Sequence, residues 1–198
     1  MIQNESGNKA AKEFEMIKKI LIAILVIAVL LIGALAVLAF MAPTDFKVER
    51  EVTINKPKSE VFAYAKMLKN QNDWGPWFKK EPTMKQEFRG TDGTVGFTSY
   101  WNGTKQEVGE GEQEIKRIVE GERIDTELRF KRPFESKADA YLTTDAAAEN
   151  QTKVKWGFSI SMRRPMNLML LVMDMDKEVG KDFGEGLASL KTILEKQP

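Results

Sequence analysis

The chain has 198 residues, with 30 basic and 29 acidic side chains and a formal net charge of +1. It contains no cysteine and no histidine, which excludes disulfides, thiolate metal sites and cysteine nucleophiles and removes the commonest general base and metal ligand. Residues 1–19 hold four lysines and three glutamates, and residues 20–41 hold no charge, so 26 basic and 26 acidic residues remain for the rest. This balance argues against nucleic acid as a partner, because phosphate backbones select strongly basic surfaces.

The first predicted element is an uncharged apolar run from Ile20 to Met41. At about 1.5 Å per residue it reaches about 33 Å, which is enough to cross the hydrocarbon core of a bilayer. A cleaved signal peptide has a shorter apolar core, of about 7 to 15 residues, with small residues just after it. A buried helix of a soluble domain seldom needs such a long run. We therefore expect a head over residues 1–19, a transmembrane helix over residues 20–41, a linker over residues 42–45 and a domain over residues 46–198.

The lysines that flank the apolar run predict its orientation. Lys18 and Lys19 directly precede the run, whereas the first basic residue after it is Lys47. The positive-inside rule then places the head in the cytoplasm and the domain on the other side of the membrane. We expect a single-pass protein of the plasma or inner membrane, with the bilayer as one partner and the C-terminal domain on the non-cytoplasmic side.

The domain begins with a strand and a helix. Residues 46–55 alternate apolar and polar side chains, as in a strand with one buried face. Pro57 then opens a helix whose apolar residues recur at helical spacing, and residues 70–73 end it in turn residues. The segment Trp74-Gly75-Pro76-Trp77-Phe78 follows as an aromatic cluster around a turn.

A series of strands comes next. Asn102-Gly103 is the strongest two-residue hairpin signal, so the strands on its two sides are expected to pair antiparallel. Alternating patterns predict strands over residues 84–89, 94–101, 105–119, 124–131, 138–142 and 153–162. After Pro165 the period becomes helical, and one apolar stripe runs along a long C-terminal helix at Val179, Phe183, Leu187, Leu190 and Leu194.

This order of elements predicts an α+β fold in which a curved antiparallel sheet wraps around the C-terminal helix. Three stretches also carry a family resemblance: Val52-Thr53-Ile54-Asn55-Lys56-Pro57 with Val61-Phe62, Trp74 to Phe78, and Lys181 to Leu187 with Leu190-Lys191. The domain resembles the START-related helix-grip superfamily, abbreviated SRPBCC, which includes polyketide cyclases and dehydrases, lipid-transfer domains and the major birch pollen allergen. It is most similar to membrane-anchored bacterial members labelled as polyketide cyclase or lipid-transport domains.

The resemblance implies a cavity between the concave face of the sheet and the C-terminal helix, where a hydrophobic molecule can lie. Gly109 and Gly111 share the inward parity of Gln113 and would leave space there, or they are bulges that bend a long strand. The other candidate cavity residues are large apolar side chains, for each of which plain core packing is the alternative: Trp74, Trp77, Phe88, Phe97, Trp101, Trp156, Phe158, Met162, Met166 and Met169.

The methionine-rich segment from Met166 to Met175 has three possible roles. It could gate the cavity, rest on the bilayer or form the buried start of the C-terminal helix. Methionine suits surfaces that accept varied apolar shapes. A segment that is apolar on all sides usually packs inside a protein, so we expect the buried start.

Catalytic motifs are missing from the sequence. Gly90, Gly93 and Gly96 lack the following Lys-Ser or Lys-Thr of a phosphate-binding loop, and the glutamates near residues 107–114 suit a solvated strand face. We therefore expect no catalytic residues, no cofactor and no metal site. Three functions remain open: a membrane-tethered binding domain for a lipid or other hydrophobic small molecule, a cyclase- or dehydrase-like enzyme, and a protein-interaction or stress-response module with a vestigial cavity.

Overall fold

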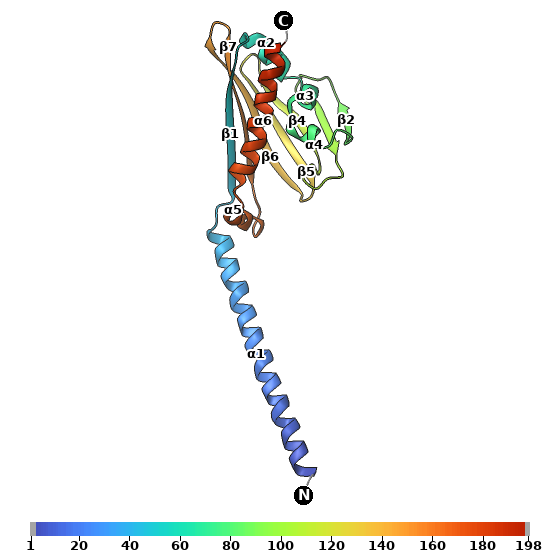
Figure 1. Cartoon of the computed structure of the whole chain (residues 1–198), viewed down its shortest axis with the longest axis vertical. Coiled ribbons are helices and arrows are strands. Elements are labelled where there is room, and N and C mark those ends of the chain that lie inside the picture. Colours follow the sequence, from blue (N-terminus) through green and yellow to red (C-terminus); the bar gives the residue numbers. More distant parts are fainter. Residues whose placement is uncertain (1–2, 197–198) are drawn as a thin grey trace.

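A computed structural model describes residues 3–196, with side chains from Lys12 onward, so the first two residues of the expected head and the last two of the domain lie outside it. A single long helix, α1 (Gln3–Met41), projects from the domain (Figure 1). Its part Lys12–Met41 is long and apolar enough to cross a membrane. The helix also includes the described part of the head, so the head and the apolar run form one continuous helix.

Seven antiparallel strands form one curved sheet in the order β1-β7-β6-β5-β4-β3-β2, which confirms the predicted α+β architecture. The first and the last strand along the chain are neighbours in this sheet. β1 pairs with β7 over its whole length, from Asp45 opposite Ser161 to Ile54 opposite Thr152. The strands are β1 (Asp45–Ile54), β2 (Lys85–Arg89), β3 (Thr98–Asn102), β4 (Glu110–Val119), β5 (Arg123–Arg132), β6 (Ser136–Ala148) and β7 (Gln151–Ser161).

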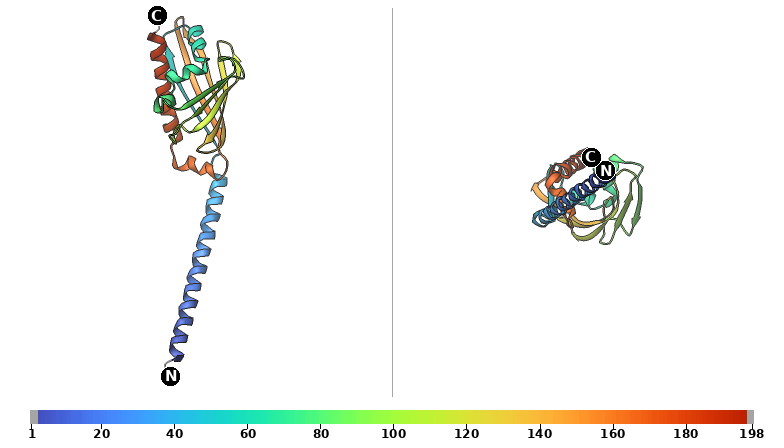
Figure 2. Two further views of the ribbon diagram at one scale, coloured as in Figure 1. Left: turned by 90° about the vertical axis from the view of Figure 1, so that its right-hand side faces the viewer. Right: turned by 90° about the horizontal axis from the view of Figure 1, so that it is seen from below.

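The last helix, α6 (Met175–Lys196), lies across the concave face of the sheet (Figure 2). It begins where the Asp174 carboxylate accepts a hydrogen bond from the Lys177 N–H at 3.0 Å, which caps the first turn. Its buried side chains include Phe183, Leu187, Leu190 and Leu194, so the predicted apolar stripe is confirmed. Shorter helices complete the fold: α2 (Lys58–Ala65), η1 (Leu68–Asn70), α3 (Gln71–Trp74), α4 (Pro76–Lys80), η2 (Met166–Leu168) and α5 (Met169–Val172).

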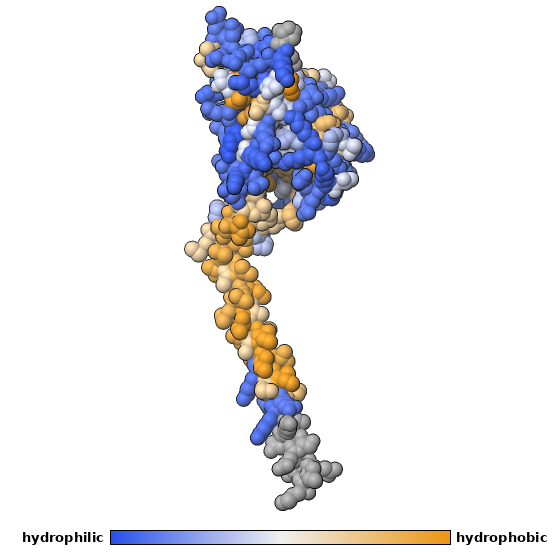
Figure 3. Space-filling model, viewed as in Figure 1, coloured by the Kyte–Doolittle hydropathy of each residue, from blue (hydrophilic) through white to orange (hydrophobic). Residues whose placement is uncertain are grey.

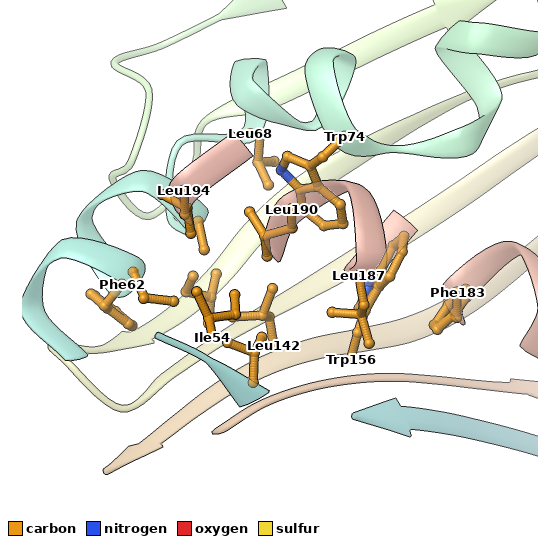
Figure 4. Packing of buried hydrophobic residues seen from close by; sticks show 14 of the residues in the cluster. Ile54, Phe62, Leu68, Trp74, Leu142, Trp156, Phe183, Leu187, Leu190 and Leu194 are labelled. Carbon is orange, nitrogen blue, oxygen red and sulfur yellow. The ribbon is translucent and has the colours of Figure 1, made fainter. Parts of the chain in front are cut away.

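The solid core fills the part of the space between sheet and α6 that lies toward the C-terminal end of the helix. Leu190 and Leu194 pack there against Ile54 of β1 and against the helices α2 and α3 (Figure 4). Trp74 is fully buried, and its ring centroid lies 4.9 Å from that of Trp156. Large side chains thus fill the space between sheet and α6 at this end, whereas the N-terminal half of α6 covers a less densely filled space.

Two details of the strand prediction are wrong, although the antiparallel pairing of β3 with β4 is confirmed. The expected hairpin at Asn102-Gly103 is instead a wider loop over residues 103–109. A buried carboxylate from elsewhere in the chain, Glu81, organises this loop by accepting hydrogen bonds from the N–H groups of Thr104 and Lys105. The strand expected from residue 94 begins only at Thr98, because three glycines with positive φ turn the chain within residues 90–97.

The prediction for the methionine-rich segment is also wrong. The segment does not form the buried start of α6, because it folds into η2 and α5, and Leu171, Val172 and Met173 are exposed. Within it, the polar Asn167 is fully buried. The Asn167 side chain donates hydrogen bonds to carbonyl oxygens at the end of α1. These hydrogen bonds explain both the burial of Asn167 and the position of the segment beside the long helix.

Candidate functional site

A cavity of about 290 Å³ lies between the concave face of the sheet and the N-terminal half of α6. Ligand pockets of proteins typically occupy about 300 to 1,000 Å³, so this one suits a compact molecule. Strands β2 to β7 supply its floor, α3, α4 and α6 supply its roof, and the loop over residues 103–109 borders its rim.

One wall of the cavity is aromatic. Trp156 and Phe158 point inward from alternate positions of β7, and Phe183 comes down from α6. The rings of Trp156 and Phe183 stack with centroids 4.0 Å apart, and Trp77 of α4 meets Trp156 edge-on at 5.7 Å. Because α6 and β7 hold each other's rings in place, this wall is preorganised and apolar.

Trp101 of β3 forms the opposite wall with Phe130 of β5, at a centroid distance of 5.9 Å. The indole N–H of Trp101 donates to the carbonyl oxygen of Val108 at 3.0 Å, which fixes the ring against the 103–109 loop. The ring lies over Gly111, its partner across the two strands, so a β-carbon on Gly111 would sit 2.7 Å from it. The small residue therefore makes room for the tryptophan.

Side-chain amides line the third part of the cavity. Asn72 of α3 and Gln86 of β2 donate to each other's carbonyl oxygens at 2.9 and 2.8 Å. Gln113 of β4 donates to the hydroxyl of Thr126 at 3.1 Å. Each amide has two donor hydrogens and an oxygen with two lone pairs, so these pairings leave hydrogen-bonding capacity for an uncharged polar group.

The rim consists of exposed residues on two neighbouring loops. Gln106 and Glu107 come from the 103–109 loop, and Arg132 and Pro133 come from the end of β5 and the turn after it. The Arg132 guanidinium donates to the carbonyl oxygen of Gly103 at 3.0 Å, which ties the two loops together. The rim is therefore polar, while the interior is largely apolar.

Glu81 supports the rim from beneath. Its carboxylate accepts hydrogen bonds from the Thr104 N–H and hydroxyl, both at 2.8 Å, and from the Lys105 N–H at 3.1 Å. These hydrogen bonds favour the charged form, so the backbone N–H groups of Thr104 and Lys105 lower the pKa of Glu81 below the ordinary carboxyl value. At neutral pH the loop is thus built around a buried carboxylate.

The ionisable side chains of the cavity lie at its rim. Among the described residues that line the cavity, the ionisable side chains are Glu107 and Arg132, and both lie exposed at the rim. General acid–base catalysis needs such groups within hydrogen-bond reach of a substrate in the interior. No cluster of three or more potential ligands for a metal ion occurs within the described part of the chain.

The structure brings four of the predicted cavity residues together around this space: Trp77, Trp101, Trp156 and Phe158. The others lie elsewhere. Trp74 belongs to the solid core, and Phe88 stacks on Phe97 at 6.1 Å beside the connection between β2 and β3. Three methionines lie at the end of the domain next to α1: Met162, Met166 and Met169.

The two predicted glycines serve the backbone rather than the cavity volume. Gly109 has a φ of 63°, and a β-carbon there would collide with the carbonyl oxygen of Arg132. At Gly111 the Arg129 carbonyl oxygen and the Trp101 ring occupy the space that a side chain would need. Several lining residues were not among the predicted cavity residues, although Val179 belongs to the predicted apolar stripe: Gln71, Asn72, Gln86, Phe130 and Val179.

No family model matches the sequence, and no curated protein matches it. Solved structures do match it. Ara h 8.0201 superposes with a TM-score of 0.56 at 16% identity, covering 77% of this chain and 99% of that one. Norcoclaurine synthase from Thalictrum flavum has a TM-score of 0.57 at 9% identity, covering 79% and 91%. The Aha1 dimer from Colwellia psychrerythraea has a TM-score of 0.50 at 15% identity, covering 76% and 97%. At identities of 9 to 16% this likeness shows the fold alone, and the chain has the helix-grip fold.

Proposed function

We propose that this protein is a membrane-tethered binding domain for a compact, uncharged hydrophobic molecule. The observation that carries the proposal is the cavity of about 290 Å³ with one aromatic wall, one amide-bearing wall and a polar rim. Apolar pockets with a few well-placed polar groups are the usual form of small-molecule sites. The aromatic wall would hold the body of the ligand, and the amides of Gln86 and Gln113 would meet a hydroxyl, carbonyl or amide on it.

The size and charge of the site narrow the ligand class. A volume near the lower end of known ligand pockets favours a ring compound or a single short chain over a lipid with two long chains. An uncharged interior disfavours ionic ligands, since a buried charge without a partner is costly. Norcoclaurine synthase, a structural neighbour, was solved in complex with dopamine and hydroxybenzaldehyde. This complex supports the proposal, because a protein of similar fold there holds small aromatic molecules.

Tethering is part of the proposal. The α1 segment Lys12–Met41 is long and apolar enough to span a bilayer, and its large side chains are exposed rather than packed on the domain. A soluble helix of this kind would expose a large continuous apolar surface to water, which soluble proteins avoid. We propose a single span with the domain on the non-cytoplasmic side of the plasma or inner membrane.

Native mass spectrometry of the detergent-purified full chain tests the binding function directly. We expect a bound species whose extra mass is lost on denaturation, and which is an uncharged organic molecule smaller than a two-chain phospholipid. Recovery of the chain without such a species, together with failure to bind an uncharged aromatic probe, would count against the proposal. Detection of chemical turnover of the bound species would instead favour the enzyme alternative.

A further inference from the structure

The strand register places several segments at one end of the sheet. β1 begins at Asp45, a short connection after the end of α1 at Met41, and pairs there with Ser161 at the end of β7. The turn over residues 133–135, which joins β5 to β6, lies at the same end, and so does the 103–109 loop between β3 and β4. The two loops that form the rim and the C-terminal end of α1 therefore lie at the same end of the domain (Figure 1).

Hydrogen bonds lock α1 to this end. The Asn167 amide donates to the carbonyl oxygens of Ala39 at 2.7 Å and Ala42 at 3.2 Å. Arg164 donates to the carbonyl oxygens of Ala39 at 3.1 Å and Phe40 at 3.3 Å. The last carbonyl groups of a helix have no hydrogen-bond partner within the helix, and here side chains of the domain are their partners. The position of the segment after β7 is thus set relative to the end of the long helix.

Exposed apolar side chains gather at this end of the domain. We define the basal patch as Leu171, Val172 and Met173, at and after the end of α5, together with Phe134 in the turn between β5 and β6. Their exposed fractions are 48%, 82%, 44% and 52%. The space-filling view shows apolar surface that continues from α1 onto the base of the domain, whereas most of the visible domain surface is hydrophilic (Figure 3).

We propose that the basal patch contacts the surface of the bilayer that α1 spans and so holds the rim of the cavity at the membrane interface. The inference rests on the proposed transmembrane role of α1. The interface on each side of a bilayer is roughly 5 to 8 Å thick, and the patch begins about one helical turn from Asn167, which touches the end of the span. Arg163 and Arg164 are exposed, and Arg164 contacts the end of α1, so lipid phosphates would meet these side chains at the membrane interface.

The position of the basal patch also bears on how a ligand would enter the cavity. Phe134 directly follows Pro133, which lines the rim. If Phe134 inserts among the lipid headgroups, an apolar ligand passes between bilayer and cavity with little exposure to water. The partner of the basal patch is therefore the lipid interface itself, and the same geometry would supply the cavity with molecules dissolved in the membrane.

Site-specific fluorescence in lipid vesicles tests this inference on the full chain. Because the sequence contains no cysteine, one introduced cysteine carries one environment-sensitive label. Val172→Cys and Phe134→Cys report on the patch. Val95→Cys is the matched control, since Val95 is also exposed but lies between β2 and β3 at the opposite end of the sheet. Gly33→Cys, with nothing within 4 Å of its β-carbon position, reports on α1 itself.

We expect lipids with a quencher near the headgroup to reduce the emission of the labels at Val172 and Phe134 but not at Val95. A quencher deep in the acyl chains should reduce emission at Gly33.

Quenching at Gly33 with patch labels that behave like Val95 overturns the inference and leaves the anchor intact. Unquenched Gly33 overturns the anchor on which the inference rests. A blue shift at Val172 without lipid quenching indicates a protein partner, such as a second copy, and overturns it as well. Quenching at Val172 alone contradicts the placement of the rim.

Discussion

Phe183 of α6 stacks on Trp156 of β7, with ring centroids 4.0 Å apart and an interplanar angle of 14°. The pair stands at the boundary between two regions of the grip. Leu187 and Leu190 continue from it into the solid core, whereas Val179 precedes it along the cavity. One aromatic contact therefore fastens the helix to the sheet and also forms part of the wall of the candidate site.

Replacement of this phenylalanine tests how firmly the helix holds the sheet. Phe183→Ala should lower the free energy of unfolding by about 3 to 5 kcal/mol, because a buried ring is lost and its cavity is only partly filled. Urea unfolding of the fragment beginning at Phe46, which we expect to be soluble, monomeric and cooperatively folded, measures the change. Phe183→Leu serves as the milder control. A loss below about 1 kcal/mol for alanine would mean that the helix does not cover the sheet.

Gly111→Leu distinguishes a glycine that leaves a void from one that makes room for a ring. A side chain at this position meets the Arg129 carbonyl oxygen and the Trp101 ring, both at 2.7 Å from the β-carbon. We expect overpacking to lower stability by about 1 to 3 kcal/mol. Thermal unfolding measures this, and Gly184→Leu is a control, because nothing lies within 4 Å of its β-carbon position. A Gly111→Leu variant as stable as the wild type would show open space above the strand.

The buried carboxylate of Glu81 predicts a pH-dependent rim. Hydrogen bonds from Thr104 and Lys105 lower the pKa of Glu81 in the folded state, so its stabilising contribution is present above the ordinary carboxyl value of 4.5 and is lost as pH falls through the lowered pKa. Glu81→Gln should lower the melting temperature at neutral pH, and the difference from wild type should shrink in acid. Glu149→Gln, in an exposed turn, should show no such trend. A difference that stays constant with pH would contradict this role.

The lysines that precede the apolar run within α1 predict the side of the membrane on which the domain lies. Lys18 and Lys19 should keep the N-terminus in the cytoplasm. A reporter that is active only outside the cytoplasm, fused after the last residue, should therefore be active. Replacing both lysines with glutamine and adding two lysines after Pro43 should weaken or invert this result. A stable but inactive fusion of the wild-type chain would place the domain in the cytoplasm.

Much of the fold could be predicted from the sequence, because it depends on patterns local to each element. The alternation through Trp156 and Phe158 belongs to one strand, and the stripe through Phe183 belongs to one helix. Each pattern shows by itself which face is buried. The same locality explains why the sequence alone predicts that Trp156 and Phe158 share one face of a strand.

The rest of the site depends on contacts between distant elements. Asn72 and Gln86 meet only because α3 folds over β2, and Glu81 shapes a loop far along the chain. Nothing in the neighbourhood of these residues indicates their partners. Gly111 is an instructive case, because its meaning depends on the strand register that places it opposite Trp101. A glycine paired across a hairpin with a tryptophan is a usable signal, but only once the register is known.

The most direct test of the central claim is whether an uncharged apolar molecule occupies this cavity. Ala140 of β6 lines the cavity and is buried, so Ala140→Leu should fill part of it, whereas Ala146→Leu places the same change at an exposed position of the same strand. The measurement is energy transfer from the cavity tryptophans to phenylnaphthylamine, titrated into the fragment beginning at Phe46. We predict saturable binding to the wild type and to Ala146→Leu, and strongly weakened binding to a folded Ala140→Leu. No saturable binding to the wild type, or equal binding to all three proteins, would contradict the account.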